Sequence, residues 1–149
     1  MLKIYSSSKE DTLALGEKAA SLFAPGDVVL LRGDLGAGKT AFTSGVGKGL
    51  NCGEDVISPT FNILKCYFHG TIPMYHIDAY RLDGQNIELG LEEFIEGDGV
   101  CLIEWPDYIS PLLPDDYLSI SIFHDGEGRR IEIEGVGPRG TALEEGLRQ

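Results

Sequence analysis

Eight consecutive residues match the phosphate-loop pattern G-x-x-x-x-G-K-[ST] in full: Gly33-Asp34-Leu35-Gly36-Ala37-Gly38-Lys39-Thr40. The glycines allow a tight backbone curl in which N–H groups converge on phosphate oxygens. In such a loop Lys39 reaches the β- and γ-phosphates, and the hydroxyl of Thr40 ligates Mg²⁺. The sequence therefore predicts a site for a nucleotide with magnesium. We expect ATP or ADP, because the guanine-reading pattern N/T-K-x-D does not occur in the sequence.

The segments on both sides of this loop favour an α/β fold. Residues 28–31 form a continuous aliphatic run, which is typical of a strand buried on both faces. Residues from Lys39 to about Leu50 are expected to form the helix that follows the loop. A second buried strand is predicted at residues 100–103.

Periodicity of apolar residues predicts the remaining elements. Further strands are expected at residues 2–6, 62–68, 72–77, 118–122 and 131–133, with hairpin turns at residues 69–71 and 125–128. Helical spacing marks residues 13–23, after a capping-box spacing of Ser7 and Glu10, and residues 87–95. The predicted fold is a P-loop NTPase-like three-layer α/β sandwich with a mixed, mostly parallel sheet and an antiparallel hairpin near the C-terminus.

Length and composition fit one globular domain over residues 1–149. The chain has 42% hydrophobic residues and 7 prolines, and no apolar run approaches the ~18–20 residues of a membrane span. The first residues lack the apolar core of a signal peptide, so a cytoplasmic protein is expected. Three cysteines without a CxxC pair argue against a disulfide framework and against a zinc site. Residues 135–149, rich in Gly and Glu, are expected to be a frayed helix or disordered.

The charge distribution argues against direct nucleic-acid binding. The formal net charge is −12, and residues 82–128 contain no Lys or Arg but 12 of the 24 carboxylates. Such a surface repels phosphate backbones. Two interpretations of this acidic stretch remain open: a solvated face, or a docking face for a basic partner protein.

Two carboxylates are candidates for the chemistry that a phosphate loop alone does not perform. Asp78 and Glu104 each end a predicted hydrophobic strand, where ligands bind in open α/β sheets. One is expected to hold Mg²⁺, directly or through water, and the other to orient the attacking water. Spacing does not decide which residue has which role, and either could be a solvated strand end.

Three further residues have two interpretations each. Thr60, in the sequence Ser58-Pro59-Thr60-Phe61, can sense the γ-phosphate as switch segments do, or belong to an ordinary Ser-Pro turn. His76 either points at the metal site or forms a hydrogen bond within its strand. Trp105 either stacks beside Glu104 or anchors the core or its rim.

Four blocks together resemble the TsaE (YjeE) family, a bacterial ATPase needed for threonylcarbamoyladenosine formation in tRNA. They are GDLGAGKT at 33–40, SPTF at 58–61, HIDAYRL at 76–82 and LIEWP at 102–106. Thr12 and Leu15-Gly16 also fit the T-x-x-L-G pattern of the family. The resemblance covers roughly residues 5–134. Two departures are Ala41, where the family commonly has a second threonine near the α-phosphate, and Ser44, where a basic residue is frequent.

The resemblance implies a P-loop fold with weak intrinsic ATPase activity. The implied partners are TsaD and TsaB, with tRNA reached only through their complex, and the role is to support or reset that complex. It places the nucleotide at residues 33–41 beside Trp105, and the adenine near Ser8 and Thr12. It implies that Thr40 binds Mg²⁺ together with Glu104 or Asp78. It also implies that Thr60 belongs to the switch loop. A monomer or a weak nucleotide-dependent dimer is expected, with no membrane partner.

Two other functions remain open from the sequence. A small P-loop kinase would clamp the transferred phosphate with basic lid residues, but Arg81 is the only candidate for such a role near the motifs, and no Lys or Arg occurs in the stretch after it up to residue 128. A nucleotide-dependent scaffold would need binding without hydrolysis.

Overall fold

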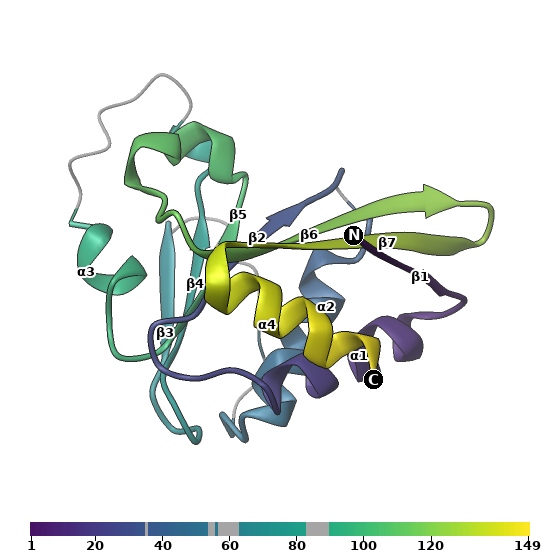
Figure 1. Ribbon diagram of the computed structural model, residues 1–149, viewed down its shortest axis with the longest axis horizontal. Coiled ribbons are helices and arrows are strands. Elements are labelled where there is room, and N and C mark those ends of the chain that lie inside the picture. The colour runs from purple at the N-terminus through teal and green to yellow at the C-terminus, as the bar shows by residue number, and fades with distance from the viewer. Residues whose placement is uncertain (35, 54–55, 57–62, 83–89) are drawn as a thin grey trace.

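A seven-stranded mixed sheet forms the centre of the protein, as seen in a computed structural model that describes residues 1–34, 36–53, 56, 63–82 and 90–149. The strand order is β1-β7-β6-β2-β5-β4-β3 (Figure 1). The strands are β1 (Leu2–Ser6), β2 (Val28–Arg32), β3 (Leu64–Tyr67), β4 (Met74–Asp78), β5 (Val100–Glu104), β6 (Tyr117–Asp125) and β7 (Gly128–Val136).

Strand directions confirm the predicted mixed sheet. The β2–β5, β2–β6 and β4–β5 pairs are parallel, and the β1–β7, β3–β4 and β6–β7 pairs are antiparallel. Five strands therefore run in one direction, and only β3 and β7 run against them. The β3–β4 and β6–β7 hairpins were expected from the sequence, whereas the pairing of the first strand with β7 was not.

The two faces of the sheet are covered unequally. Helices α1 (Lys9–Ala20), α2 (Lys39–Gly49) and α4 (Gly137–Arg148) lie together on one face (Figure 1). The other face is covered by α3 (Glu92–Ile95) and by the 3₁₀ helices η1 (Tyr80–Leu82) and η2 (Pro106–Leu112). Three layers are present, but the second covering layer is thin because its helices are short.

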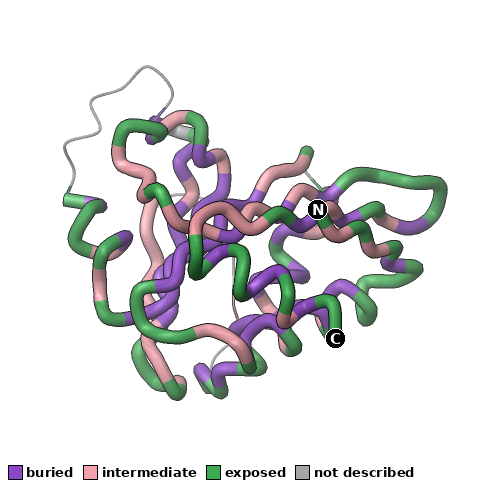
Figure 2. The backbone as a smooth tube through the Cα atoms, viewed as in Figure 1, coloured by how far each residue is buried: buried purple, intermediate pink, exposed green. Residues whose placement is uncertain are grey.

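Alternating side chains on the central strands fill a core on each face. In β2, Val29 and Leu31 pack toward α1 and α2, whereas Val28 and Leu30 pack toward the short helices. The buried part of the chain follows these strands (Figure 2). Burial on both faces explains why β2 reads as an unbroken aliphatic run.

The C-terminal segment differs from the expectation of a frayed or disordered tail, because residues 137–148 form the packed helix α4. Leu143 and Leu147, one turn apart, are buried in the core shared with α1 and α2. Lys18 of α1 donates through Nζ to the carbonyl of Leu147 at 3.1 Å. Arg139 donates through Nε to Asp27 Oδ1 at 2.9 Å. These long-range contacts, invisible in local composition, order the helix.

The first helix is capped one residue later than the Ser7–Glu10 spacing predicts. Ser8 is the N-cap, and its hydroxyl accepts a hydrogen bond from the Asp11 amide at 3.2 Å. Ser7 donates through its amide and its hydroxyl to Asp11 Oδ2. Asp11 therefore takes the acidic position that the sequence assigned to Glu10, with its carboxylate accepting from Ser7, the residue before the N-cap.

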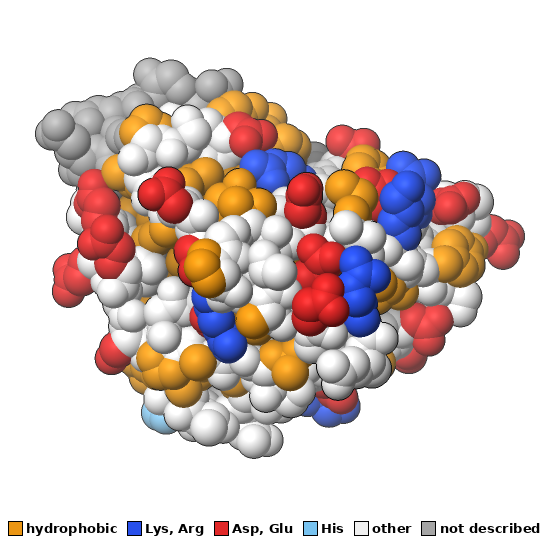
Figure 3. All heavy atoms as spheres, in the orientation of Figure 1, with side chains coloured by type: hydrophobic (Ala, Val, Ile, Leu, Met, Phe, Trp, Pro, Cys, Tyr) orange, Lys and Arg blue, Asp and Glu red, His pale blue; other side chains and the backbone are white. Residues whose placement is uncertain are grey.

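The surface is acidic but not uniformly so. On the face shown in Figure 3, acidic side chains gather at the edge that α3 occupies, while elsewhere Lys and Arg side chains lie among them. None of the helices in the described part of the chain is long and apolar enough to cross a membrane.

Candidate functional site

The phosphate loop joins the central strand β2 to helix α2. The strand ends at Arg32 and the helix begins at Lys39. Strands β5 and β6, both parallel to β2, flank it on either side. The loop therefore lies at the carboxyl ends of parallel strands, which is where open α/β sheets bind ligands.

Three glycines in the loop, Gly33, Gly36 and Gly38, have positive φ, a backbone geometry that side chains rarely adopt. Gly33 has φ 152°, and a β-carbon on it would lie 2.7 Å from the carbonyl oxygen of Ile122 in β6. Gly38, the N-cap of α2, has φ 117°, although a β-carbon there would meet only ordinary contacts. A side chain at position 33 is therefore excluded by both space and backbone conformation, whereas at position 38 only the backbone conformation requires glycine.

A buried ionic cluster lies at the start of α2. Lys39 Nζ is 3.6 Å from Glu104 Oε1, and both side chains are only 6% exposed. His76, fully buried on β4, donates through Nε2 to Glu104 Oε2 at 2.6 Å. The last residue of β5 therefore joins the phosphate-loop lysine to a histidine from the neighbouring strand. His76 therefore forms its hydrogen bond with the neighbouring strand and not within β4, and its partner is one of the two candidate carboxylates.

The electrostatics separate the two candidate carboxylates. Burial raises the pKa of Glu104, but the hydrogen bond from His76 and the charge of Lys39 outweigh burial and leave that pKa below its usual value. Burial is also the largest effect on the half-buried Asp78, and with the nearby charge of Glu104 it raises the pKa of Asp78 despite a hydrogen bond from the Tyr80 amide. Asp78 and Glu104 are register partners on adjacent strands. Environments that move two neighbouring pKa values apart are typical of functional carboxylates.

Trp105 lies over the lysine and also packs, partly buried, against the core on the side of the short helices, which fits the expected rim anchor. Its ring centroid lies 4.3 Å from Lys39 Nζ, a cation–π distance. The ring is stacked on Tyr108 at an interplanar angle of 9° and contacts Tyr80. Trp105 has φ 56°, and such left-handed geometry in a bulky residue is rare and clusters at functional sites.

A small pocket next to the phosphate loop is formed by the end of β1, the start of α1 and the start of β7. It has a volume of about 100 Å³ and is lined by Ser6, Ser8, Lys9, Thr12, Glu127, Gly128 and Arg129. A β-carbon on Gly38 would lie 3.9 Å from Thr12 Cγ2, so this pocket reaches the loop. Ser8 and Thr12 were both expected near the nucleotide.

Arg129, on β7, is a loop contact that sequence reasoning missed. It donates through Nε to the carbonyl of Ala37 at 2.9 Å and through Nη2 to that of Gly36 at 3.2 Å. The residue is 90 positions beyond Lys39 and belongs to none of the motifs. The one available signal was a pair of arginines after the turn at residues 125–128.

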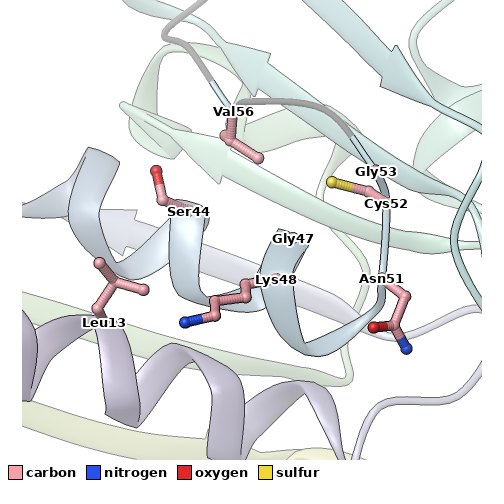
Figure 4. Close-up of a pocket in the computed structure, with 8 residues that line it drawn as sticks. All are labelled: Leu13, Ser44, Gly47, Lys48, Asn51, Cys52, Gly53 and Val56. Atoms are coloured by element: carbon pink, nitrogen blue, oxygen red, sulfur yellow. The ribbon is translucent and has the colours of Figure 1, made fainter.

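A larger cavity lies at the other end of α2 and has different chemistry. It has a volume of about 610 Å³, and its lining comes from α1, from α2 and from the segment after α2 (Figure 4). The residues are Leu13, Ser44, Gly47, Lys48, Asn51, Cys52, Gly53 and Val56. Lys48 is exposed and pairs with Glu17 at 3.2 Å. Of the expected catalytic residues that the structure describes, Lys39, Asp78 and Glu104, none lines this cavity.

The donors near the loop suit Mg²⁺ better than a softer metal. Thr40 offers a hydroxyl at the exposed start of α2, and Asp78 and Glu104 offer carboxylates. Within the described ranges there is no group of three or more His, Cys, Asp or Glu residues able to hold a metal by themselves. Magnesium is commonly held by one or two carboxylates together with substrate phosphates and water, so this donor set fits it.

The other residues predicted to bind the nucleotide lie outside the Lys39–Glu104 cluster or outside the described part of the chain. Asp34 is exposed, and its carbonyl accepts from the Ala37 amide at 3.0 Å. Ala41 is buried in the first turn of α2. Leu35 and Thr60 lie outside the described residues, as does the start of the helix predicted at 87–95.

Comparisons with known proteins agree with this architecture. The family model described as "Threonylcarbamoyl adenosine biosynthesis protein TsaE" matches residues 6–131. A Bacillus subtilis protein named tRNA threonylcarbamoyladenosine biosynthesis protein TsaE is 44% identical over 98% of this chain and 93% of its own length. A Nostoc protein of the same name is 42% identical over 87% of this chain and 83% of its own. The crystal structure of YdiB from Bacillus subtilis superposes with a TM-score of 0.86 at 42% identity, covering 99% of this chain and 93% of that one. By the family model, by these relatives and by the shared fold, the chain belongs to the TsaE family.

Proposed function

We propose that this protein is a Mg²⁺-dependent P-loop ATPase that supports threonylcarbamoyladenosine biosynthesis in tRNA. The observation that carries the ATPase proposal is the buried contact between Lys39 and Glu104 at the start of α2. It puts the residue that binds phosphates in such loops beside a carboxylate able to act on water. The names of the TsaE relatives support the biosynthetic role.

We assign different roles to the two carboxylates. Glu104 is held by His76 and lies next to Lys39, so it is placed to orient the attacking water and accept its proton at Oε1 or Oε2. Asp78, half-buried beside it, would hold Mg²⁺ together with the Thr40 hydroxyl. When bound, the metal supplies positive charge that neutralises the phosphate oxygens.

The remaining binding residues surround this centre. The backbone from Gly33 to Ala41 would bind the phosphates, and Trp105 would keep Lys39 extended toward them. The pocket lined by Ser8 and Thr12 would receive the adenine. Thr60 remains our proposed γ-phosphate sensor.

We propose TsaD and TsaB as partners in the cytoplasm, with tRNA reached only through their complex. The charge of −12 supports this indirect route, because an acidic protein does not attract a polyphosphate backbone. The resemblance to the TsaE family supports the choice of partners.

Multi-turnover tRNA modification with purified TsaD and TsaB tests the proposal. We expect the wild-type protein with ATP and Mg²⁺ to sustain product formation over many turnovers, and a non-hydrolysable ATP analogue to fail. Equal modification with the analogue would favour a nucleotide-dependent scaffold. Rapid ADP formation that depends on one small acceptor would instead favour a kinase.

The two carboxylate roles can be separated by titrating Mg²⁺. We expect Asp78→Asn to raise the Mg²⁺ concentration needed for tight ATP binding, whereas Glu104→Gln leaves this requirement unchanged. If instead Glu104→Gln raised the Mg²⁺ requirement and Asp78→Asn left it unchanged, the two roles would have to be reversed.

A further inference from the structure

We propose that Arg129 is a positioning residue of the phosphate loop, which it holds by two carbonyls so that the Gly38 amide faces the nucleotide. The inference rests on the proposed nucleotide binding at residues 33–40. It concerns a contact between distant segments, because Arg129 lies on β7 and the loop follows β2, two strands away in the sheet.

The sheet explains how Arg129 reaches the loop. In register, it lies opposite His124 of β6 and Ser6 of β1. The loop crosses the end of β6, where Gly33 closely approaches the carbonyl of Ile122. This crossing brings the carbonyls of Gly36 and Ala37 within hydrogen-bond distance of the Arg129 guanidinium, at 3.2 and 2.9 Å.

Because the peptide group is planar, the two hydrogen bonds from Arg129 to carbonyls also fix the directions of the amides that follow these carbonyls. In a trans peptide the carbonyl and the following N–H point in opposite directions. The Ala37 amide accordingly donates to Asp34 on the far side of its peptide from the Gly36 carbonyl. The Ala37 carbonyl, held by Arg129 Nε, in the same way directs the Gly38 N–H away from Arg129. The Ala37 amide is thus used within the loop, and it is the Gly38 amide that the anchored loop presents to an anion without having to reorganise.

The guanidinium is committed to backbone carbonyls instead of a carboxylate. Its third nitrogen, Nη1, donates to the carbonyl of Gly128 at 2.8 Å. Over the described part of the chain no salt bridge engages Arg129, whereas the adjacent Arg130 pairs with Glu132 at 2.9 Å. An uncompensated positive charge therefore lies beside a loop that binds phosphates. Lysine could supply this charge but not the fork that spans two carbonyls.

Nucleotide titrations of three variants test the inference, with the full-length protein and calorimetric detection of ADP and of ATP with Mg²⁺. We expect Arg129→Gln to weaken binding about tenfold or more, and Arg129→Lys about threefold or more, because the lysine lacks the fork. Arg130→Gln is the matched control, and its affinity is expected within about twofold of the wild type.

Two results would overturn the proposal. One is an Arg129→Gln affinity within about threefold of the wild type, and the other is a full wild-type affinity in Arg129→Lys, which would show that charge alone acts. A second measurement needs no nucleotide: in the free protein, Arg129→Lys should shift the NMR resonances of the Ala37 and Gly38 amides and speed their hydrogen exchange, and unchanged signals would refute the anchoring. If the wild type binds no nucleotide, the proposed function fails, and the NMR result still decides the role of Arg129.

Discussion

The two ends of helix α2 differ in chemistry as well as in the size of their cavities. The N-terminal end has a buried lysine, a buried carboxylate and a loop whose glycines have positive φ. The C-terminal end has a cavity of about 610 Å³, but its lysine is exposed and pairs with a half-exposed Glu17 (Figure 4). A charge held out of water interacts strongly with a phosphate, whereas an exposed pair contributes little. We therefore place the nucleotide at the end with less empty space.

The largest expected effect comes from Glu104→Gln, which keeps the shape of the side chain but removes its charge. Loss of a positioned base typically slows turnover about 10²–10⁴-fold. ATP binding should persist, since Lys39 and the loop are unchanged. Steady-state phosphate release and calorimetry measure the two properties separately.

Glu17→Gln is the matched control, because Glu17 pairs with the lysine at the other end of the helix. Its ATP turnover should equal that of the wild type. A similar loss in both variants would mean that the Glu104 effect comes from altered helix packing and not from chemistry.

Replacement of the two lysines compares the ends of α2 directly. Lys39→Ala should weaken ATP binding about 10- to 150-fold, the range expected for losing a charge-assisted contact. Lys48→Ala removes an exposed ion pair and should change the affinity less than about twofold. Calorimetric titration of both variants gives the comparison, and thermal melting checks that both are folded. If Lys48→Ala has the larger effect, the nucleotide binds at the wide cavity and our placement is wrong.

Much of this contrast could be predicted from sequence, since the phosphate loop and the strand-end carboxylates are local patterns. The loop pattern at residues 33–40 and the position of Glu104 at the end of a hydrophobic run can both be recognised from adjacent residues. For this reason the loop, the helix after it and both buried strands could be predicted. The His76–Glu104 contact could not be read, because it depends on the side-by-side pairing of β4 and β5. For the same reason Arg129 was missed and α4 was expected only as a frayed helix or a disordered tail: their partners lie far away in the chain.

Gly38→Ala tests the backbone requirement at the start of α2. Space is available for the β-carbon, so the cost comes from φ 117°, a conformation that typically costs a non-glycine residue about 1–3 kcal/mol. Relief of this strain would rotate the Gly38 amide, so ATP binding should weaken about tenfold. Calorimetry and denaturant unfolding measure the two consequences. Wild-type affinity in this variant would show that the loop adapts when the nucleotide binds.

The smallest effect is expected at the other end of α2, where positive φ serves structure alone. Asn51 has φ 58°, and its amide and that of Cys52 donate to the Lys48 and Gly47 carbonyls, as in a Schellman cap. Asn51→Ala should lower the free energy of unfolding by about 1 kcal/mol, and Asn51→Gly should change it by only a few tenths. Neither should alter ATP affinity, as urea unfolding and calorimetry would show. Loss of nucleotide binding in Asn51→Ala, at unchanged stability, would mean that the two ends of α2 are coupled and do not act separately.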